Sequence, residues 1–485
     1  MNIYSRIVIL CLIVHVHLSE VVVAQNEPVV TLGKRREIFV DKYLIDKMEG
    51  LSLVMHTPRD EGPVLYFDKP WEGPFSAYGT VIKDKTGYRI YYRGMPATAA
   101  DDSEIQVTCV ANSSDGINWT KPELGLYQVG GNSKNNVVLA GDPAVNHNFS
   151  PFLDSNPQAP AARRYKAIGG GVKTGLYAYF SPDGLHWTRA QQGPVFTKGV
   201  FDSQNVAFWS EEEKRYVLYF RTWTEGGFKG KRSVSKTVSS DFIHWQEPVA
   251  MTFGDTPYED IYTHQTSPYF RAPHIAIAIG ARFMPGRKVV SDEQARILNV
   301  NPSYYKDCSD AILMSTRGGN NYDRTFMESF IRPGIGLKNW VSRSNYPALN
   351  VVQTGADEMS VYVNQDYAQP TAHVHRYSLR LDGFASVAAS YQPGILTTRF
   401  FTFEGSQLLL NYATSAPGEI QVEIQDENGK PVPGFTFNEA GIIIGNEISR
   451  TVFWNSKSDV RQLAGKKIRL KIRMKDADLY ALWFE

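Results

Sequence analysis

The sequence is poor in cysteine, in helical periodicity and in long apolar runs. It has only three cysteines in 485 residues, so disulfides do not build this fold. Cys11 falls in an N-terminal leader, and we expect the other two, Cys109 and Cys308, to stay unpaired. Cys-x-x-Cys and His-Glu-x-x-His patterns are both missing, so the sequence gives no support for a transition-metal site.

The sequence has no excess of positive or of negative charge. Lys and Arg number 51 against 50 Asp and Glu, a formal net charge of +1. This balance gives no field that would attract nucleic acid or acidic lipid, so neither is expected as a partner.

One short apolar run lies at the N-terminus. Residues 7–16 are apolar, follow Arg6 and precede a small-residue site, Val22-Val23-Ala24. This order predicts a signal peptide at residues 1–24, and hence a secreted or periplasmic protein without a membrane span in its mature chain. The alternative of an uncleaved anchor stays open, although the run is short for a bilayer of about 30 Å.

Most of the chain consists of short, aromatic-rich or alternating runs bounded by Gly, Pro, Asn and Asp, which predicts an all-β protein. A turn motif recurs among these runs, as Ser113-Ser114-Asp115-Gly116-Ile117-Asn118-Trp119, Ser181-Pro182-Asp183-Gly184-Leu185-His186-Trp187 and Ser239-Ser240-Asp241-Phe242-Ile243-His244-Trp245, with a degenerate copy at 315–322. The tryptophans are 68 and 58 residues apart, which fits four-stranded propeller blades with insertions. We interpret Asp115, Asp183 and Asp241 as structural turn residues on outer hairpins.

The repeats predict a five-bladed β-propeller at residues 25–389, followed by a β-sandwich at 390–485 that braces the propeller or binds carbohydrate. Residues 37–46 are expected to close the ring beside the last blade. The inner strands are expected to begin near residues 75–78, 147–150, 202–205, 259–262 and 357–360.

Acids and amides are dense at these expected strand starts, which meet on one face of a propeller. Cleavage of a glycosidic bond needs one carboxyl group that donates a proton and a second that activates water or attacks the sugar. We therefore predict Asp202, Glu259 and Glu358 as catalytic carboxylates. His147, Asn148, Gln204, Asn205, Tyr262 and His264 are predicted to bind the substrate. The alternative for each acid is a hydrogen bond between blades.

The aromatic Tyr91-Tyr92-Arg93 strand, the Asp-Gly-x-x-Trp hairpins and the acids at inner-strand starts resemble the five-bladed β-propeller glycoside hydrolases, the group of invertase-like fructosidases and arabinanases. The resemblance implies a monomeric, secreted, exo-acting hydrolase of plant or algal oligo- or polysaccharides, in a bacterial branch of that group. It needs no cofactor, although a structural Ca²⁺ on the axis is compatible with it. The invertase segments Asn-Asp-Pro-Asn-Gly, Arg-Asp-Pro and Glu-Cys-Pro are missing, so fructose is not the expected substrate.

Two other functions fit the same sequence. A sialidase would need three arginines around a substrate carboxylate and a tyrosine nucleophile, and Arg93, Arg271, Arg282 and Arg324 are the candidates, although five blades are one too few. A non-catalytic carbohydrate-binding propeller would need the pocket but not the convergent acids.

Overall fold

The protein is described by a computed structural model, which places residues 29–99 and 105–485. The predicted signal peptide lies outside these residues. Strands make up almost all of the regular structure, and the described helical segments are short: α1 (Pro143–Asn146), α2 (Asp292–Ile297), η1 (Ala161–Arg163) and η2 (Arg461–Leu463). The all-β prediction is confirmed. In the described part of the chain, no helix is long and apolar enough to cross a membrane.

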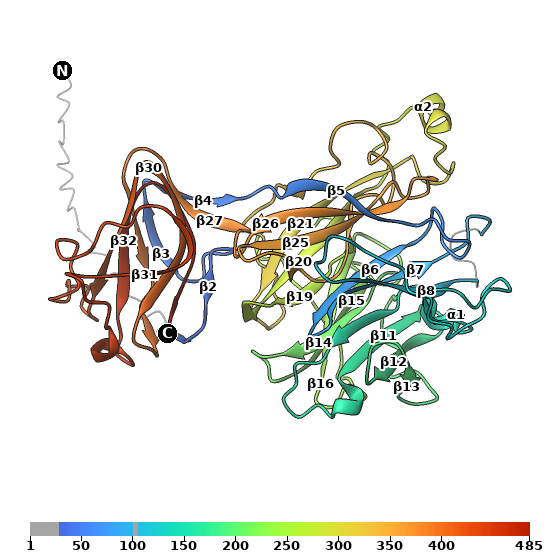
Figure 1. The fold of residues 1–485 in the computed structure, drawn as a ribbon, viewed down its shortest axis with the longest axis horizontal. Helices are drawn as coiled ribbons and strands as arrows, with labels where there is room; N and C mark the ends of the chain where they lie inside the picture. Colours follow the sequence, from blue (N-terminus) through green and yellow to red (C-terminus); the bar gives the residue numbers. More distant parts are fainter. Residues whose placement is uncertain (1–28, 100–104) are drawn as a thin grey trace, which may run out of the picture.

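The larger of the two lobes in Figure 1 is a propeller of five antiparallel sheets. Blade 1 contains β6 (Ala77–Asp84), β7 (Gly87–Gly94), β8 (Val107–Ser113) and β9 (Val137–Leu139). Blade 2 contains β10 (Ser150–Leu153), β11 (Tyr165–Gly171), β12 (Gly175–Ser181) and β13 (Thr188–Arg189). Blade 3 contains β14 (Val206–Ser210), β15 (Arg215–Trp223), β16 (Arg232–Ser239) and β17 (Val249–Ala250). With the two blades described next, these sheets make five, so the five-bladed fold class is confirmed.

The last two blades have a divided innermost strand. Blade 4 contains β18 (Ile261–Thr263), β19 (Thr266–Tyr269), β20 (Ala272–Met284), β21 (Cys308–Thr316) and β22 (Ser329–Ile331). Blade 5 contains β23 (Tyr346–Pro347), β24 (Val352–Gln353), β25 (Glu358–Gln365), β26 (His373–Arg380) and, outermost, β5 (Arg59–Tyr66). Inner strands of successive blades contact each other, and Thr80 of blade 1 bridges to Leu349 of blade 5.

The ring is closed by β5, which comes from the N-terminal part of the chain and pairs with β26 from Ser378↔Arg59 to His373↔Tyr66. The prediction that residues 37–46 close it is wrong. That segment contains β2 (Glu37–Ile38), which pairs with the last strand of the second lobe instead. An alternating pattern identifies a half-buried strand but does not identify its partner, which explains the error.

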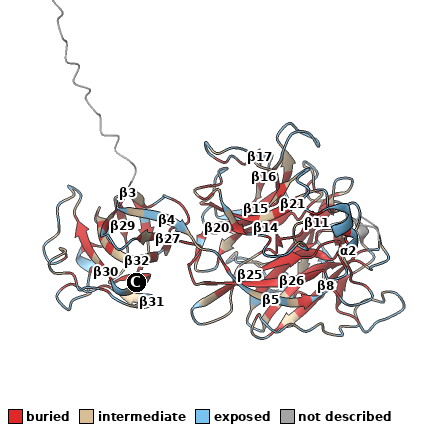
Figure 2. Cartoon of the chain, turned by 90° about the horizontal axis from the view of Figure 1, so that it is seen from above, coloured by how far each residue is buried: buried red, intermediate tan, exposed pale blue. Residues whose placement is uncertain are grey.

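The second lobe is a β-sandwich built from both ends of the chain (Figure 1). Besides β2 it contains β1 (Val30–Gly33), β3 (Ile45–Glu49), β4 (Leu51–Met55), β27 (Ala385–Ala389), β28 (Gly394–Thr398), β29 (Phe401–Phe403), β30 (Leu408–Gln425), β31 (Asn446–Thr451) and β32 (Arg469–Phe484). Strand β32 is its centre, pairing with β2, β27, β28 and β30. Its alternate residues Leu470, Ile472 and Met474 are buried in the core. Figure 2 shows buried segments in the strands of both lobes.

The repeated turn motif has the predicted structural role. In the second copy, the Oδ1 atom of Asp183 accepts hydrogen bonds from the backbone N–H groups of Leu185 (2.8 Å) and His186 (2.9 Å). Gly184 has a φ of +77°, and its carbonyl accepts a hydrogen bond from the hydroxyl of Tyr91 in blade 1. A Cβ atom at Gly184 would lie 2.5 Å from that hydroxyl. The motif therefore closes a hairpin and joins neighbouring blades.

Buried charges connect the lobes. In the sandwich, Glu37 accepts from His274 of blade 4 (2.9 Å) and lies 2.9 Å from the guanidinium of Arg317, which follows β21. Arg317 also forms an ion pair with Asp41 at 2.8 Å. Burial alone would raise the pKa of Glu37, but Arg317 and His274 outweigh it and lower that pKa. These buried contacts join the two lobes.

We expect Asp183→Ala to reduce stability by about 1–2 kcal/mol, because two backbone N–H groups lose their acceptor. Partial burial would raise the pKa of Asp183, but the hydrogen bonds from His186 and Leu185 lower it. A carboxylate whose pKa is lowered by folding stabilises the fold at pH values above its ordinary pKa, near 3.8. This contribution to stability is lost as the pH falls below that value. Thermal unfolding should thus show a difference at pH 7 that shrinks under acid. The exposed Asp357→Ala is the control, and an equal effect there would contradict the turn role.

We expect Arg317→Met to cost about 3–5 kcal/mol, because it leaves two buried carboxylates without their guanidinium. Differential scanning calorimetry should show a lower unfolding temperature. The matched control is Arg35→Met, which removes an exposed ion pair with Glu212 and should cost no more than about 1 kcal/mol. Equal shifts for the two variants would show that the buried cluster does not hold the lobes together.

Candidate functional site

The starts of the inner strands surround a cavity of about 390 Å³, here called the axial cavity. Every blade contributes to its wall: β6 of blade 1, the segments around β10 and β11 of blade 2, the segment before β14 of blade 3, β18 of blade 4 and the segment before β23 of blade 5. The lining residues are Tyr78, Gln106, His147, 170–174, Phe201, Asp202, Tyr262 and Arg343. Three of the nine predicted site residues, His147, Asp202 and Tyr262, thus lie together.

Asp202 is the only carboxylate among the cavity's lining residues that the structure describes. Its Oδ1 atom lies 3.1 Å from Nε of Arg221, a buried residue of β15, and its backbone carbonyl accepts from Nη2 of the same guanidinium at 2.7 Å. That guanidinium also lies 4.3 Å from the ring centre of Tyr262. The side chain of Asp202 stays 35% exposed, so it is held in place and still open to a ligand.

Tyr78 has a strained backbone in the cavity wall. Its φ of +56° is in the left-handed region, which bulky side chains adopt at a cost of order 1–3 kcal/mol. The guanidinium of Arg93 lies 5.0 Å from its ring centre, and the ring of His147 lies 5.4 Å away. Burial, and next the nearby Tyr262, raise the pKa of Tyr78 well above its ordinary value. The phenol is therefore a hydrogen-bond donor at neutral pH.

The other four residues predicted to bind substrate are buried behind the cavity. The amide of Asn148 donates to the carbonyls of Phe201 (3.0 Å) and Ser203 (2.7 Å), and so holds the segment that carries Asp202. Asn205 donates to the carbonyl of Ser203. Burial lowers the pKa of His264 to about 3, so this imidazole is neutral at pH 7. These side chains position the wall and do not line the cavity.

Gln204 belongs to a hydrogen-bonded plug on the axis. Its Nε2 donates to Oγ1 of Thr80 in blade 1 (2.8 Å), and its Oε1 accepts from Gln265 of blade 4 (2.7 Å), which also donates to the carbonyl of Pro347 in blade 5. The plug joins four blades. In the described parts of the chain, no group of three or more His, Cys, Asp or Glu side chains is placed to hold a metal ion. Cys109 and Cys308 are free and buried.

Glu259 lies in a different cavity, on blade 4. Its carboxylate accepts hydrogen bonds from Arg282 (2.9 Å) and Arg324 (2.7 Å). Burial would raise its pKa, but the two arginines lower it, so Glu259 is not suited to donate a proton. Arg282 and Arg324, two of the four arginines proposed for a sialidase, are used in this cluster, and Arg271 is bound to Asp382 at 3.0 Å. The arginine triad that the sialidase hypothesis needs is therefore not formed by these residues.

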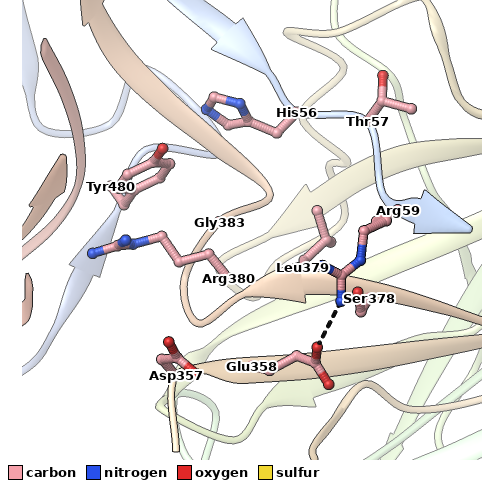
Figure 3. A pocket seen from close by; sticks show the side chains of 10 residues that line it. All are labelled: His56, Thr57, Arg59, Asp357, Glu358, Ser378, Leu379, Arg380, Gly383 and Tyr480. Atoms are coloured by element: carbon pink, nitrogen blue, oxygen red, sulfur yellow. Dashed lines mark hydrogen bonds and ion pairs between the residues drawn. The ribbon is translucent and has the colours of Figure 1, made fainter. Parts of the chain in front are cut away.

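Glu358 lies in a third cavity, of about 350 Å³, where the sandwich meets the propeller. Figure 3 shows it directed at Arg59, with Tyr480 of β32 also in the wall. Its carboxylate also pairs with the buried Arg376. The prediction that Asp202, Glu259 and Glu358 share one cavity is therefore wrong. The innermost strand of blade 5 is β23–β24, so Glu358 begins the second strand, which runs antiparallel and starts at the opposite face.

Sequence reasoning missed Tyr78, Gln106 and Arg343. Tyr78 stands in an expected strand start, residues 75–78, but this segment contains no acid or amide and no site residue is predicted there. Arg343 precedes β23, which was not recognised as an inner strand. A search for aromatic and cationic residues at every strand start would have identified Tyr78.

No protein-family model matches the sequence, and neither does any curated protein. Solved structures do resemble the fold. One titled "Glycoside hydrolase" has a TM-score of 0.45 at 11% identity, covering 67% of this chain and 92% of its own. An N-acetylgalactosamine deacetylase from F. plautii gives 0.45 at 14%, covering 68% and 96%. A Bombyx mori GH32 beta-fructofuranosidase gives 0.40 at 11%, covering 87% and 94%. At these identities the likeness concerns the fold alone, and function must be inferred from the chain's own cavities.

Proposed function

We propose that the protein is a secreted or periplasmic, monomeric glycoside hydrolase that cleaves glycosidic bonds of a plant or algal oligo- or polysaccharide in the axial cavity. One observation supports this above all: five blades bring aromatic, cationic and hydrogen-bonding side chains around a single carboxylate, Asp202, in a cavity of about 390 Å³. Aromatic walls with a few fixed polar groups are typical of small-ligand sites. A compact cavity on the axis suits the end of a sugar chain, hence exo-action.

Asp202 is the proposed catalytic carboxylate. Its contact with Arg221 at 3.1 Å fixes the carboxylate in the cavity, where it could attack an anomeric carbon or activate a water molecule. Tyr78, His147 and Tyr262 surround it and would donate hydrogen bonds to sugar hydroxyls or stack on a sugar ring. In this scheme Asn148 and Arg221 are positioning residues.

A second candidate function is carbohydrate binding without catalysis. It is favoured by the presence of only one carboxylate among the described residues of the axial cavity, because hydrolysis by general acid and base ordinarily uses two. The sialidase hypothesis has no comparable support, since Arg271 pairs with Asp382 whereas Arg282 and Arg324 pair with Glu259.

Asp202→Asn separates the two candidates. A screen of the whole chain against aryl glycosides and plant and algal polysaccharides first supplies a substrate. The variant should then lower kcat by at least about 10²-fold while ligand affinity changes little, because the amide keeps the shape and loses the charge. Glu358→Gln, in the cavity between the lobes, is the matched control and should leave kcat unchanged. Binding without turnover in the unmodified protein would favour the non-catalytic candidate, and full turnover in Asp202→Asn would exclude this carboxylate.

A further inference from the structure

The cavity on blade 4 that contains Glu259 has a surplus of positive charge. Its volume is about 660 Å³, and we call it the blade-4 cleft. Arg282, Arg287 and Arg332 line it, with Asp310 and Glu259 as the lining acids. Asp310 binds Arg282 through two hydrogen bonds of 2.9 and 2.6 Å. The second lining acid, Glu259, is shared between Arg282 and the buried Arg324, so both carboxylates are already neutralised.

Arg287 and Arg332 supply the surplus. Both are exposed, and neither has a carboxylate within ion-pair distance among residues 29–99 and 105–485. Asp292, the acid nearest to Arg287 in sequence, forms an ion pair with Lys288. Asp307 accepts the backbone N–H of Gly286 at 2.7 Å. Two guanidinium groups at one cavity are suited to bind a carboxylate or sulfate group. Each guanidinium can bind such a group through two parallel hydrogen bonds.

An aromatic ring lies in the same wall. The indole Nε1 of Trp340 donates to the carbonyl of Gly334 at 3.2 Å, which fixes the ring at the cleft, and the side chain is only half-buried. An exposed indole face is the usual partner of the apolar face of a sugar ring. Cations beside an aromatic platform therefore fit a sugar that carries a negative charge.

The cleft adjoins the axial cavity. Trp340 in the cleft and Arg343 in the axial cavity are three residues apart, so their Cα atoms are separated by no more than about 11 Å. Between them Val341 is fully buried, and the Oγ of Ser309 in the cleft donates to the carbonyl of Ser344 at 2.8 Å. This loop is thus a fixed wall between the two cavities.

We propose that the blade-4 cleft is a subsite for an anionic sugar of the substrate, with Arg287 and Arg332 binding its carboxylate or sulfate group and Trp340 stacking on its ring. The inference rests on the proposed function, because it extends the sugar chain held in the axial cavity. It narrows the substrate class to acidic glycans, either uronic-acid-containing or sulfated.

Binding of defined oligosaccharides to the whole chain tests this subsite. The probes are an oligogalacturonide for the carboxylate, a sulfated carrageenan oligosaccharide for the sulfate and a neutral galacto-oligosaccharide of equal length, measured by isothermal titration calorimetry. At least one acidic probe should bind tenfold or more tighter than the neutral probe, and raising NaCl from about 50 to about 500 mM should weaken that binding. The tighter acidic probe identifies the anionic group.

The double variant Arg287→Ala/Arg332→Ala should lose that tenfold preference, whereas Arg215→Ala/Arg296→Ala, which removes two exposed arginines elsewhere, should keep it. Trp340→Ala should weaken all three probes. Equal binding of acidic and neutral probes, or an unchanged preference in the double variant, would overturn the subsite. If the unmodified protein binds the probes without turnover while the acidic preference depends on Arg287 and Arg332, the hydrolase proposal fails and the subsite stands. If the protein hydrolyses its substrate and the double variant keeps the acidic preference, the hydrolase proposal stands and the subsite fails.

Discussion

The pairing of β5 with β26 is the constraint on which the rest of the structure depends. Five blades meet on one axis only if the last is complete, and its outermost strand comes from residues 59–66. Without this strand the edge of β26 would be open, and an open edge is prone to pair with other chains. The axial cavity takes side chains from all five blades, so its shape also requires a closed ring.

Arginine–carboxylate contacts recur wherever segments distant in sequence must hold a fixed geometry. Such contacts join the lobes at Glu37 and Arg317 and fix Asp202 beside Arg221. Another contact pairs Glu259 with Arg282 on blade 4. Such pairs are costly to bury unless their hydrogen bonds are satisfied, but once formed they specify geometry well. The same type of contact therefore supports the fold at two of these places and presents a carboxylate to a cavity at the third.

Local patterns in the sequence were sufficient to predict the propeller. The Ser-x-Asp-Gly turns and their tryptophans act over a few residues, so their spacing predicted the blades and the structural role of Asp115, Asp183 and Asp241. Strand order within a blade depends on pairing partners, which the pattern does not contain, and this misplaced Glu358 by one strand. Side-chain direction could not be predicted either. Gln204 and Asn205 stand at the predicted strand start, but Gln204 points into the axial plug and Asn205 donates to the carbonyl of Ser203. Tyr78 reaches the cavity through a left-handed backbone that the sequence does not indicate.

The sandwich contains both the first described strands and β32, and the propeller lies between them in sequence. During synthesis the blades emerge before residues 469–484 leave the ribosome, so β2 must wait until β32, its partner, has been made. A chain that ended before β32 would have a nearly complete propeller attached to a β2 strand without its partner. Biogenesis of this protein is thus sensitive to the strand at residues 469–484, which contributes nothing to the axial cavity.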